Sequence, residues 1–493
     1  MKKILSASQI RLADKDYIEQ VGHSSLELME NAARAFCSCF TQLIPDKDTE
    51  VLVLCGTGNN GGDGLAIARL LFQAGYTHIA VLVFKFSRHV SPDFEINLRA
   101  LQTLPITIST LDQQEELPDI SQDVLIDAIL GSGLNRSVEM PLKAHFEAIN
   151  RLGKRVIAVD MPSGLNEGGA DILQGSVLIA EEVICFERPK LIFFLPESAP
   201  YLKQFHVVPI GLNNAFMDQL DSAISYVEET DVKSIYRTRP KFSHKGTFGH
   251  ALILAGGVGK VGAGLLCAEA CVYSGAGLTS LDIGEETTSV HVRLPEVMTV
   301  NLTLDQKPIK GYTCIALGPG LGDRIAPLMQ LLPLKGYPLV LDADALTYLS
   351  QHREILNDLN AETILTPHMK EFDRLFGSSK SWLDRLEKAK KAAKQFHVII
   401  ILKNRYTFIV LSDGSVCINT TGNAGMSIGG MGDVLTGVIA AFLAQGYSGA
   451  EAAVLGVYLH GKAGDILQHQ GMAVIPPTRL IQTLPQVIGA LMK

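Results

Sequence analysis

A glycine-rich stretch that leads into a helix is the clearest chemical signal in this sequence. It reads Gly429-Gly430-Met431-Gly432-Asp433, after which apolar residues recur at helical spacing as far as Ile439. Glycine lets the backbone approach a ligand closely, and the first N–H groups of a helix lack partners at the positive end of its dipole. The stretch therefore predicts a binding site for an anion such as phosphate.

The carboxylate of Asp433 stands where this helix begins, and two roles are open for it. It could be an ordinary cap of the helix N-terminus. It could instead stay ionised in the positive field of the helix and act as a base toward a hydroxyl group.

A second glycine loop lies in the N-terminal half. Val51–Cys55 is a short apolar run typical of a strand buried on both faces, and the loop 56–64 and a helical pattern follow it. The glycines match the dinucleotide-binding fingerprint. However, the next predicted strand, 78–84, ends at Lys85 rather than at an acidic ribose ligand, so we do not expect an ordinary NAD-dependent dehydrogenase.

Two aspartates, Asp127 and Asp160, each end a later predicted strand. Ligands of open α/β sheets bind at the carboxyl ends of the strands, although each aspartate could also be a simple turn residue. Together with Asn60 and Ser163 they offer hard oxygen ligands for an alkali or alkaline-earth cation. One carboxylate could then hold the cation while the other moves protons.

The C-terminal half repeats the pattern of buried strand and polar end. A glycine loop follows the predicted strand 251–255, Asp342 and Asp344 end another, and His368 ends a third. A single histidine is more often structural than catalytic. The segment 403–407 follows a further strand and offers cationic and hydroxyl groups to nucleotide phosphates.

Length and composition limit the possible classes of protein. The chain has 493 residues, which predicts two to three domains, with 47% hydrophobic and 19% charged residues as in ordinary globular proteins. A net charge of −8 without a dense basic run argues against binding to nucleic acid or to anionic membranes. Any phosphate site must therefore be local.

The start of the chain does not resemble a secretory signal or a membrane span, because polar residues interrupt it at once. The eight scattered cysteines lack the spacing of zinc sites, and we interpret them as buried hydrophobic residues in a reducing compartment. We expect a cytoplasmic protein that binds no nucleic acid and no membrane, and that forms a homo-oligomer. The apolar strand pattern is lost and acidic residues accumulate over 211–238, so we place the domain junction near 225, giving domains 1–225 and 226–493.

The stretch 429–437 resembles the anion-hole motif of ribokinase-like kinases, and Asn423-Ala424-Gly425-Met426 in front of it resembles the NAD(P)H-hydrate dehydratases in particular. The resemblance implies a C-terminal ribokinase-like three-layer sandwich that uses ADP as phosphoryl donor with Mg²⁺, and Asp433 as base. It implies substrate contacts at Ala263, Gly320, His368 and Asp433. It implies nucleotide contacts at Lys403, Asn404, Arg405, Tyr406, Thr407 and Gly432.

The N-terminal half resembles the NAD(P)H-hydrate epimerases, starting with Leu28-Met29-Glu30-Asn31-Ala32 and most specifically at 58–64. This implies a Rossmann-like three-layer sandwich with K⁺ near Asn60, Asp127 and Ser163, and Asp160 as the acid/base residue. Substrate contacts are implied at Asp160 and at two loops: Asn59, Asn60, Gly61, Gly62 and Asp63, and Gly131, Ser132, Gly133, Leu134, Asn135, Arg136 and Ser137.

Three positions depart from the patterns of these families. Residues 186–190 occupy the place of a family motif that usually has a small residue before its lysine. Met369-Lys370 replaces a usual Pro-Gly, and Asn404 replaces a usual Gly. Neither Met369-Lys370 nor Asn404 removes a group that the implied chemistry needs.

Two domains joined in this way are expected to repair NADH and NADPH whose nicotinamide ring has been hydrated. One domain would interconvert the epimers of the hydrate, and the other would dehydrate one epimer. Two alternatives stay open: a ribokinase-like vitamin kinase that releases a stable phosphorylated product, and an N-terminal domain that is a non-catalytic binding module, as in an RNA-decapping scaffold.

Overall fold

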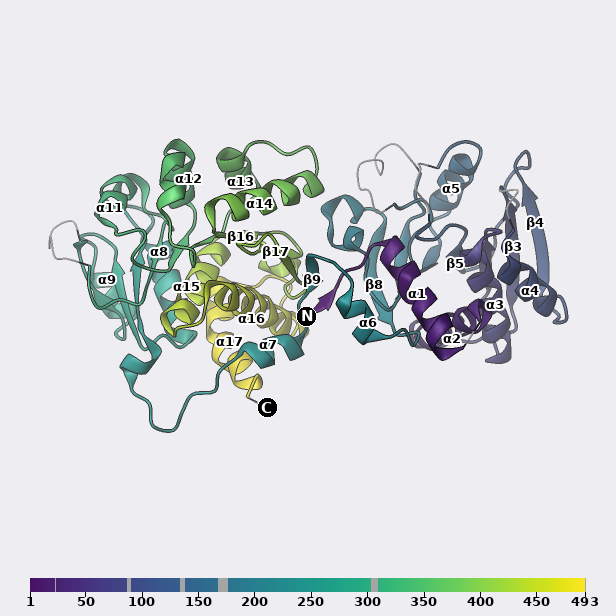
Figure 1. Cartoon of the computed structure of the whole chain (residues 1–493), viewed down its shortest axis with the longest axis horizontal. Coiled ribbons are helices and arrows are strands. Elements are labelled where there is room, and N and C mark those ends of the chain that lie inside the picture. Colours follow the sequence, from purple (N-terminus) through teal and green to yellow (C-terminus); the bar gives the residue numbers. More distant parts are fainter. Residues whose placement is uncertain (23, 87–89, 134–137, 167–175, 303–308, 493) are drawn as a thin grey trace. The chain divides into compact units, whose positions relative to one another are not determined.

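A computed structural model describes residues 1–22, 24–86, 90–133, 138–166, 176–302 and 309–492 (Figure 1). The chain divides into two compact units. The N-terminal unit comprises Lys3–Ser222 and Ser381–Leu383, and the C-terminal unit comprises Met1–Lys2, Ala223–Lys380 and Asp384–Lys493.

The N-terminal unit is built on a seven-stranded parallel sheet in the order β4-β3-β2-β5-β6-β7-β8. The chain moves outward from β2 to β4 and then returns to the other side of β2, so the order reverses between β2 and β5. Ligands of such sheets bind at this reversal, beside the carboxyl ends of the strands. The strands are β2 Val51–Cys55, β3 Ile79–Lys85, β4 Thr107–Asp112, β5 Val124–Ala128, β6 Arg155–Val159, β7 Ala180–Phe186 and β8 Leu202–Val208.

Helices cover both faces of this sheet. In Figure 1, α2, α3 and α4 lie on one face and α5 on the other. Between the sheet and α2 and α3, side chains such as Phe36, Phe40 and Ile67 are fully buried. The helices are α1 Ala7–Val21, α2 Ser25–Leu43, α3 Asn59–Gln73, α4 Pro92–Leu101, α5 Leu142–Arg151 and α6 Asn214–Gln219, with 3-10 turns η1 Leu191–Phe194 and η2 Pro196–Ser198.

The C-terminal unit is built on an eleven-stranded sheet in the order β1-β9-β18-β17-β16-β15-β14-β13-β10-β11-β12. Its strands from β16 to β12 in this order are parallel, and β17 is antiparallel to both of its neighbours. The strands are β1 Lys2–Lys3, β9 Ile224–Tyr226, β10 His250–Leu254, β11 Leu278–Asp282, β12 Met298–Thr299, β13 Cys314–Leu317, β14 Leu339–Leu341, β15 Ile364–Leu365, β16 Ile399–Leu402, β17 Thr407–Val410 and β18 Val416–Asn419. Strand β9 falls in 211–238, where we expected no strand, because three residues are too few to show a pattern.

Figure 1 shows α15 and α16 on one face of this sheet and α12, α13 and α14 on the other. Helices α8 and α16 pack against α15, which also contacts β13. Because α15 is covered on all of these sides, it can be apolar around most of its circumference. The helices are α7 Glu229–Ile235, α8 Val261–Tyr273, α9 Thr288–Arg293, α11 Ile325–Leu331, α12 Asp344–Gln351, α13 Met369–Phe376, α14 Trp382–Phe396, α15 Met431–Ala444, α16 Gly449–His469 and α17 Pro477–Ala490, with 3-10 turns η3 Lys245–Phe248, η4 Gly322–Arg324, η5 Arg353–Asp358 and η6 Ala424–Met426. Both predicted three-layer α/β sandwiches are confirmed.

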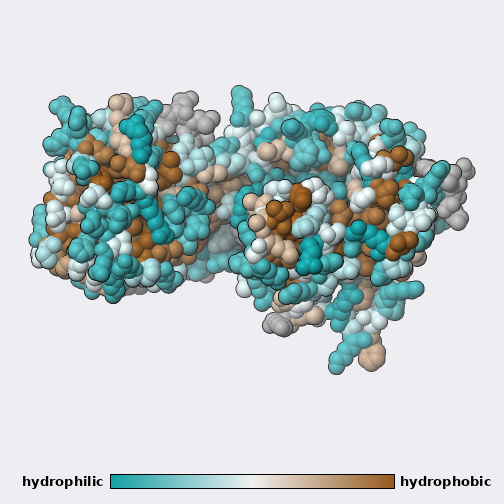
Figure 2. All heavy atoms as spheres, turned by 180° about the vertical axis from the view of Figure 1, so that it is seen from behind, coloured by the Kyte–Doolittle hydropathy of each residue, from teal (hydrophilic) through white to brown (hydrophobic). Residues whose placement is uncertain are grey.

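Hydrophobic and hydrophilic residues are interspersed on the face that Figure 2 shows. Within the described ranges, no helix combines the length and apolar character needed to cross a membrane. The eight cysteines are free, and all but Cys39 are buried, as predicted for small hydrophobic residues.

Candidate active sites

The glycine loop of the N-terminal unit folds back onto the end of β2. A Cβ on Gly61 would lie 1.8 Å from the carbonyl oxygen of Gly56, and a Cβ on Gly56 would lie 2.1 Å from that of Ile129. Only glycine fits such approaches of one backbone to another. The loop thereby holds the start of α3 against the segment that follows β5.

This geometry predicts that Gly61→Ala destabilises the N-terminal unit by about 1–3 kcal/mol or more, because the methyl group overpacks a backbone contact. Gly58→Ala is the matched control, since a Cβ there has no neighbour within 4 Å. Chemical denaturation of both variants checks the difference. Equal unfolding midpoints would show that the close approach does not exist.

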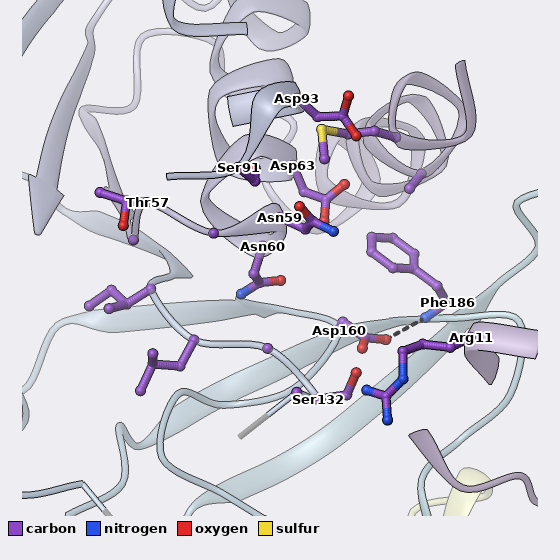
Figure 3. A pocket seen from close by; sticks show the side chains of 18 of the residues that line it. Arg11, Thr57, Asn59, Asn60, Asp63, Ser91, Asp93, Ser132, Asp160 and Phe186 are labelled. Atoms are coloured by element: carbon purple, nitrogen blue, oxygen red, sulfur yellow. Dashed lines mark hydrogen bonds between the residues drawn. The ribbon is translucent and has the colours of Figure 1, made fainter. Parts of the chain in front are cut away.

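A cavity of about 1080 Å³ opens beside this loop, within the N-terminal unit. Figure 3 shows side chains from α1, α3 and the strand ends that line it. Its lining includes the predicted contacts Asn59, Asn60, Asp63, Gly131, Ser132, Gly133 and Asp160. Gly61 and Gly62 are buried in the first turn of α3 and do not occur among the described lining residues. Leu134, Asn135, Arg136 and Ser137 lie outside the residues that the structure describes.

Asp160 occupies the centre of the cavity wall in an unusual backbone conformation, with φ at 65°. Its Oδ1 accepts hydrogen bonds from Nζ of Lys190 at 2.6 Å and from the backbone N–H of Phe186 at 3.2 Å. Lys190 is only 2% exposed and also lines the cavity. Strained backbone of this kind concentrates at functional sites. With Oδ1 held by two donors, Oδ2 is the oxygen left for a substrate.

Further carboxyl groups share the cavity with Asp160. Burial, and then the charges of Asp160, Asp14 and Asp93, raise the pKa of Asp63 well above its usual value. Burial and then the charge of Asp160 raise the pKa of Asp14 to about 6, against the lowering effect of Lys190 and Arg11. Neutral carboxyl groups can donate hydrogen bonds, so this wall offers proton donors as well as a carboxylate.

Asp127 and Ser163 meet directly in the structure. Ser163 donates its N–H to Oδ2 of Asp127 at 2.7 Å and its hydroxyl to Oδ1 at 2.5 Å. Burial raises the pKa of Asp127 to about 6, although the Ser163 bonds lower it. Asn60 packs at the other side of the segment after β5, where a Cβ on Gly131 would lie 3.2 Å from its Cβ, and its amide nitrogen is buried without a hydrogen-bond partner.

In the C-terminal unit, two distant glycine loops meet at the predicted contacts Ala263 and Gly320. The N–H of Gly256 donates to the carbonyl oxygen of Pro319 at 2.7 Å. Gly320 has a positive φ of 64°, and a Cβ there would lie 3.0 Å from Cβ of Ala263. The structure thus brings together two residues that are 57 apart in the chain.

The N-cap of α15 is Gly430, with φ at 95°, so Asp433 is not the cap but the third residue of the first turn. Burial, and then the nearby charge of Asp342, raise the pKa of Asp433 to about 6, while Lys403 lowers it. Gly432, predicted to contact the nucleotide, lies close to the side chains of both Asp342 and Lys403.

His368 is the N-cap of α13. Its Nδ1 accepts hydrogen bonds from the backbone of Lys370 and Glu371 at 3.1 and 3.4 Å, and Nε2 lies 3.3 Å from Oε1 of Glu371. The side chain is 54% exposed, so its Nε2 edge can still meet a ligand. The departure Met369-Lys370 begins the helix that His368 caps.

The segment 403–407 connects β16 to β17 and divides into two parts. Lys403 points to Asp342, at 3.1 Å. Asn404 accepts from the N–H of Arg405 at 2.8 Å, and the guanidinium of Arg405 lies over the ring of Tyr406 at 4.7 Å. The hydroxyl of Thr407 lies 3.5 Å from the carbonyl oxygen of Asn404.

Sequence reasoning did not assign four charged residues that the structure places at these sites. Lys190 contacts Asp160, Asp342 contacts Lys403, and Arg11 and Asp14 line the cavity. The sequence did give a sign that Asp342 could lie at a site, because this residue ends a predicted strand. Arg11 and Asp14 lie on an ordinary amphipathic helix and had none.

Comparison with known proteins matches both halves of the chain. The family model described as NAD(P)H-hydrate dehydratase matches residues 251–486, and the model described as YjeF-related protein N-terminus matches residues 25–192. A bifunctional NAD(P)H-hydrate repair enzyme of Thermofilum pendens is 33% identical over 99% of this chain and 97% of its own length. The chain belongs to the bifunctional NAD(P)H-hydrate repair enzymes.

Another repair enzyme and a solved structure are similar to the chain as well. The repair enzyme of Escherichia coli is 31% identical over 98% of this chain and 93% of its own length. A crystal structure of the protein SMU.573 from Streptococcus mutans covers 55% of this chain and all of its own, with 30% identity and a TM-score of 0.50. The C-terminal half is accordingly the NAD(P)H-hydrate dehydratase of the pair, and the N-terminal half is the epimerase.

Proposed function

We propose that residues 226–493 dehydrate the S epimer of NADH or NADPH hydrate with ADP as phosphoryl donor, and that residues 1–225 interconvert the R and S epimers. Membership in the repair family supports the pair of reactions. The observation that carries the dehydratase chemistry is the partly buried carboxyl of Asp433 in the first turn of α15, directly after the glycine loop.

In the proposed dehydration, Asp433 accepts the proton of the substrate's ring hydroxyl. The oxygen of that hydroxyl then attacks the terminal phosphorus of ADP. The bond from that phosphorus to the bridging oxygen breaks, and AMP leaves. The N–H groups of Gly430 to Gly432 hold the transferred group, as helix N-termini hold phosphate. Phosphate then leaves the ring carbon with the electron pair of the C–O bond, and the neighbouring carbon loses a proton to the departing phosphate, which restores the dihydropyridine.

The proposed contacts around this centre follow the two clusters described above. Ala263, Gly320 and His368 would contact the hydrated nucleotide, and Lys403 to Thr407 with Gly432 would contact ADP. No group of three or more His, Cys, Asp or Glu side chains able to hold a metal occurs in the described ranges. Mg²⁺ would therefore be held mainly by the phosphates of the nucleotide, where it neutralises charge during phosphoryl transfer.

In the proposed epimerisation, the hydrated carbon carries both the hydroxyl and the ring nitrogen. Oδ2 of Asp160 accepts the hydroxyl proton as the bond from this carbon to the nitrogen breaks, and it can return the proton to the nitrogen because both atoms are attached to one carbon. Closure of the resulting aldehyde from its other face gives the other epimer. Asn59, Asn60 and Asp63 would hold the rest of the substrate together with Gly131 to Ser137, and Gly61 and Gly62 would form the turn that carries them.

A potassium ion fits the residues proposed for it. Asp127 already accepts three hydrogen bonds, from Ser163 twice and from Ile129, and a carboxylate has room for about four. The amide nitrogen of Asn60 is buried without a hydrogen-bond partner, and the carbonyl oxygen of the same amide is the atom that could bind the cation. With Ser163 they form an oxygen-rich set that suits K⁺. A bound ion would attract the phosphates of the substrate.

Assembly into a homo-oligomer and a cytoplasmic location stay predictions.

Lys190→Met is predicted to slow epimerisation about 10- to 100-fold, because it removes a charge-assisted hydrogen bond from Asp160. The rate is measured with the R epimer as substrate, in the presence of ADP and an excess of wild-type dehydratase. Lys203→Met removes an exposed lysine of the same unit and should have no effect. Wild-type epimerisation by Lys190→Met would show that Asp160 needs no such partner.

The proposed function is tested by absorbance at about 340 nm, where reduced nicotinamide absorbs. The purified protein with ADP and Mg²⁺ is given a mixture of both NADH-hydrate epimers. Full recovery of the NADH signal is expected. Recovery that stops at the share of one epimer would refute the epimerase, and no recovery with ADP or ATP would refute the dehydratase.

A further inference from the structure

Three side chains from separate elements meet beneath the start of α15. Asp342 follows β14, Lys403 follows β16, and Thr436 lies in the second turn of α15. Oδ1 of Asp342 lies 3.1 Å from Nζ of Lys403, and Oδ2 accepts a hydrogen bond from the hydroxyl of Thr436 at 3.0 Å. Because β14 and β16 flank β15 in the parallel sheet, the ion pair spans the end of the intervening strand.

This group lies directly beside the anion hole. A Cβ on Gly432 would lie 3.6 Å from Oδ2 of Asp342 and 3.6 Å from Nζ of Lys403. The N–H groups of this first turn are the ones that would hold the transferred phosphoryl group. The ammonium of Lys403 is thus placed where the transferred phosphoryl group is expected.

Holding a lysine there has a physical difficulty that Asp342 removes. The ammonium is a point charge on a flexible stem, and the positive end of the helix dipole repels it. Asp342 is 3% exposed, and a carboxylate so deeply buried requires partners for both of its oxygens. Thr436 anchors one oxygen to α15 itself, so the other oxygen is fixed relative to the anion hole and can direct Lys403 toward it.

We propose that Asp342 is a positioning residue of the dehydratase reaction, which holds the Lys403 ammonium beside Gly432 so that it meets the phosphoryl group during transfer. This inference rests on the proposed function of the C-terminal unit. In this proposal Asp342 acts through Lys403, because its two oxygens contact Lys403 and Thr436. Its negative charge also acts on the base, because it disfavours the ionised form of Asp433.

The test is a double-mutant cycle on the full chain, with the S epimer and ADP as substrates and the unfolding midpoint of each variant as the measure of folding. Asp342→Asn keeps the shape of the side chain but removes its charge, and kcat is expected to fall about 10- to 100-fold. Lys403→Met is expected to lower kcat as well. The double variant should be no more than about threefold slower than Lys403→Met alone, because coupled residues are not additive.

The pH profile distinguishes positioning from a purely structural role. Without the charge of Asp342, the acid limb of kcat/KM should move to lower pH. The matched control is Asp373→Asn, which breaks an ion pair with Arg385 in the same unit, at 2.8 Å, without contact to the anion hole. It should leave kcat and the acid limb unchanged while lowering the unfolding midpoint.

If Asp342→Asn does not fold, Asp342→Glu replaces it. That variant keeps the charge but displaces it by one methylene. We expect kcat to fall about 10-fold or more, while the acid limb of kcat/KM stays at the same pH as in the wild type. Wild-type kcat in both substitutions, or additive effects with Lys403→Met, would overturn the inference. An inactive wild-type protein would refute the proposed function instead, before any variant is compared.

Discussion

Asp433→Asn is expected to slow dehydration of the S epimer about 10²- to 10⁴-fold, the range that a positioned general base supplies. The amide that replaces the carboxylate cannot accept the hydroxyl proton, while the backbone of the anion hole is unchanged. The measurement is kcat for NADH formation at saturating ADP. Near-normal turnover would rule out Asp433 as the base.

The same carboxyl determines how dehydration depends on pH. Its pKa is raised to about 6, chiefly by burial, and only the ionised form is a base. The value of kcat/KM should therefore be constant above about pH 7 and fall about tenfold per pH unit below pH 6. A profile without this acid limb would contradict the assignment.

Two controls accompany Asp433→Asn. Epimerisation by the same protein should be unchanged, because it depends on the N-terminal unit. Asp358→Asn makes the same chemical change at an exposed position of the C-terminal unit and should leave dehydration unaffected. Loss of both activities in Asp433→Asn would instead indicate a folding defect.

Asp160→Asn is expected to slow epimerisation about 10²- to 10⁴-fold and to leave dehydration of the S epimer at its normal rate. With a mixture of epimers, recovery of NADH should then stop at the share of the S epimer. The absorbance trace at about 340 nm shows this plateau directly.

Asp112→Asn is the matched control for Asp160, because Asp112 also ends a strand of the N-terminal sheet but is exposed. Its NADH recovery should be complete. Complete recovery at the wild-type rate by Asp160→Asn as well would mean that another group moves the proton.

Local patterns in the sequence sufficed for much of the architecture. The apolar run Val51–Cys55 is a buried strand as predicted, and it pairs with Val124–Ala128, the strand that contains Asp127. Such features depend on neighbours a few residues away, so they can be inferred without knowing the fold. Strand β9 was missed because most of what defines it is its pairing with β18, which begins 192 residues later.

The candidate sites divide in the same way. The glycine loops, the strand-end aspartates and Asp433 are local signals, and they led to the family to which the chain belongs. The roles of single residues were less accessible. Whether Asp433 capped its helix was open in the sequence, and only the backbone at Gly430 shows that the cap lies three residues earlier.

The sequence by itself determined that this protein has two α/β units with glycine loops suited to phosphate, because strand, loop and helix follow one another in a short stretch of chain. Only the tertiary structure decided which charges meet. Lys190 reaches Asp160 across 30 residues, and Lys403 reaches Asp342 across 61. These contacts arise because parallel strands bring their carboxyl ends to one edge of the sheet, and which strands become neighbours depends on packing of the whole unit.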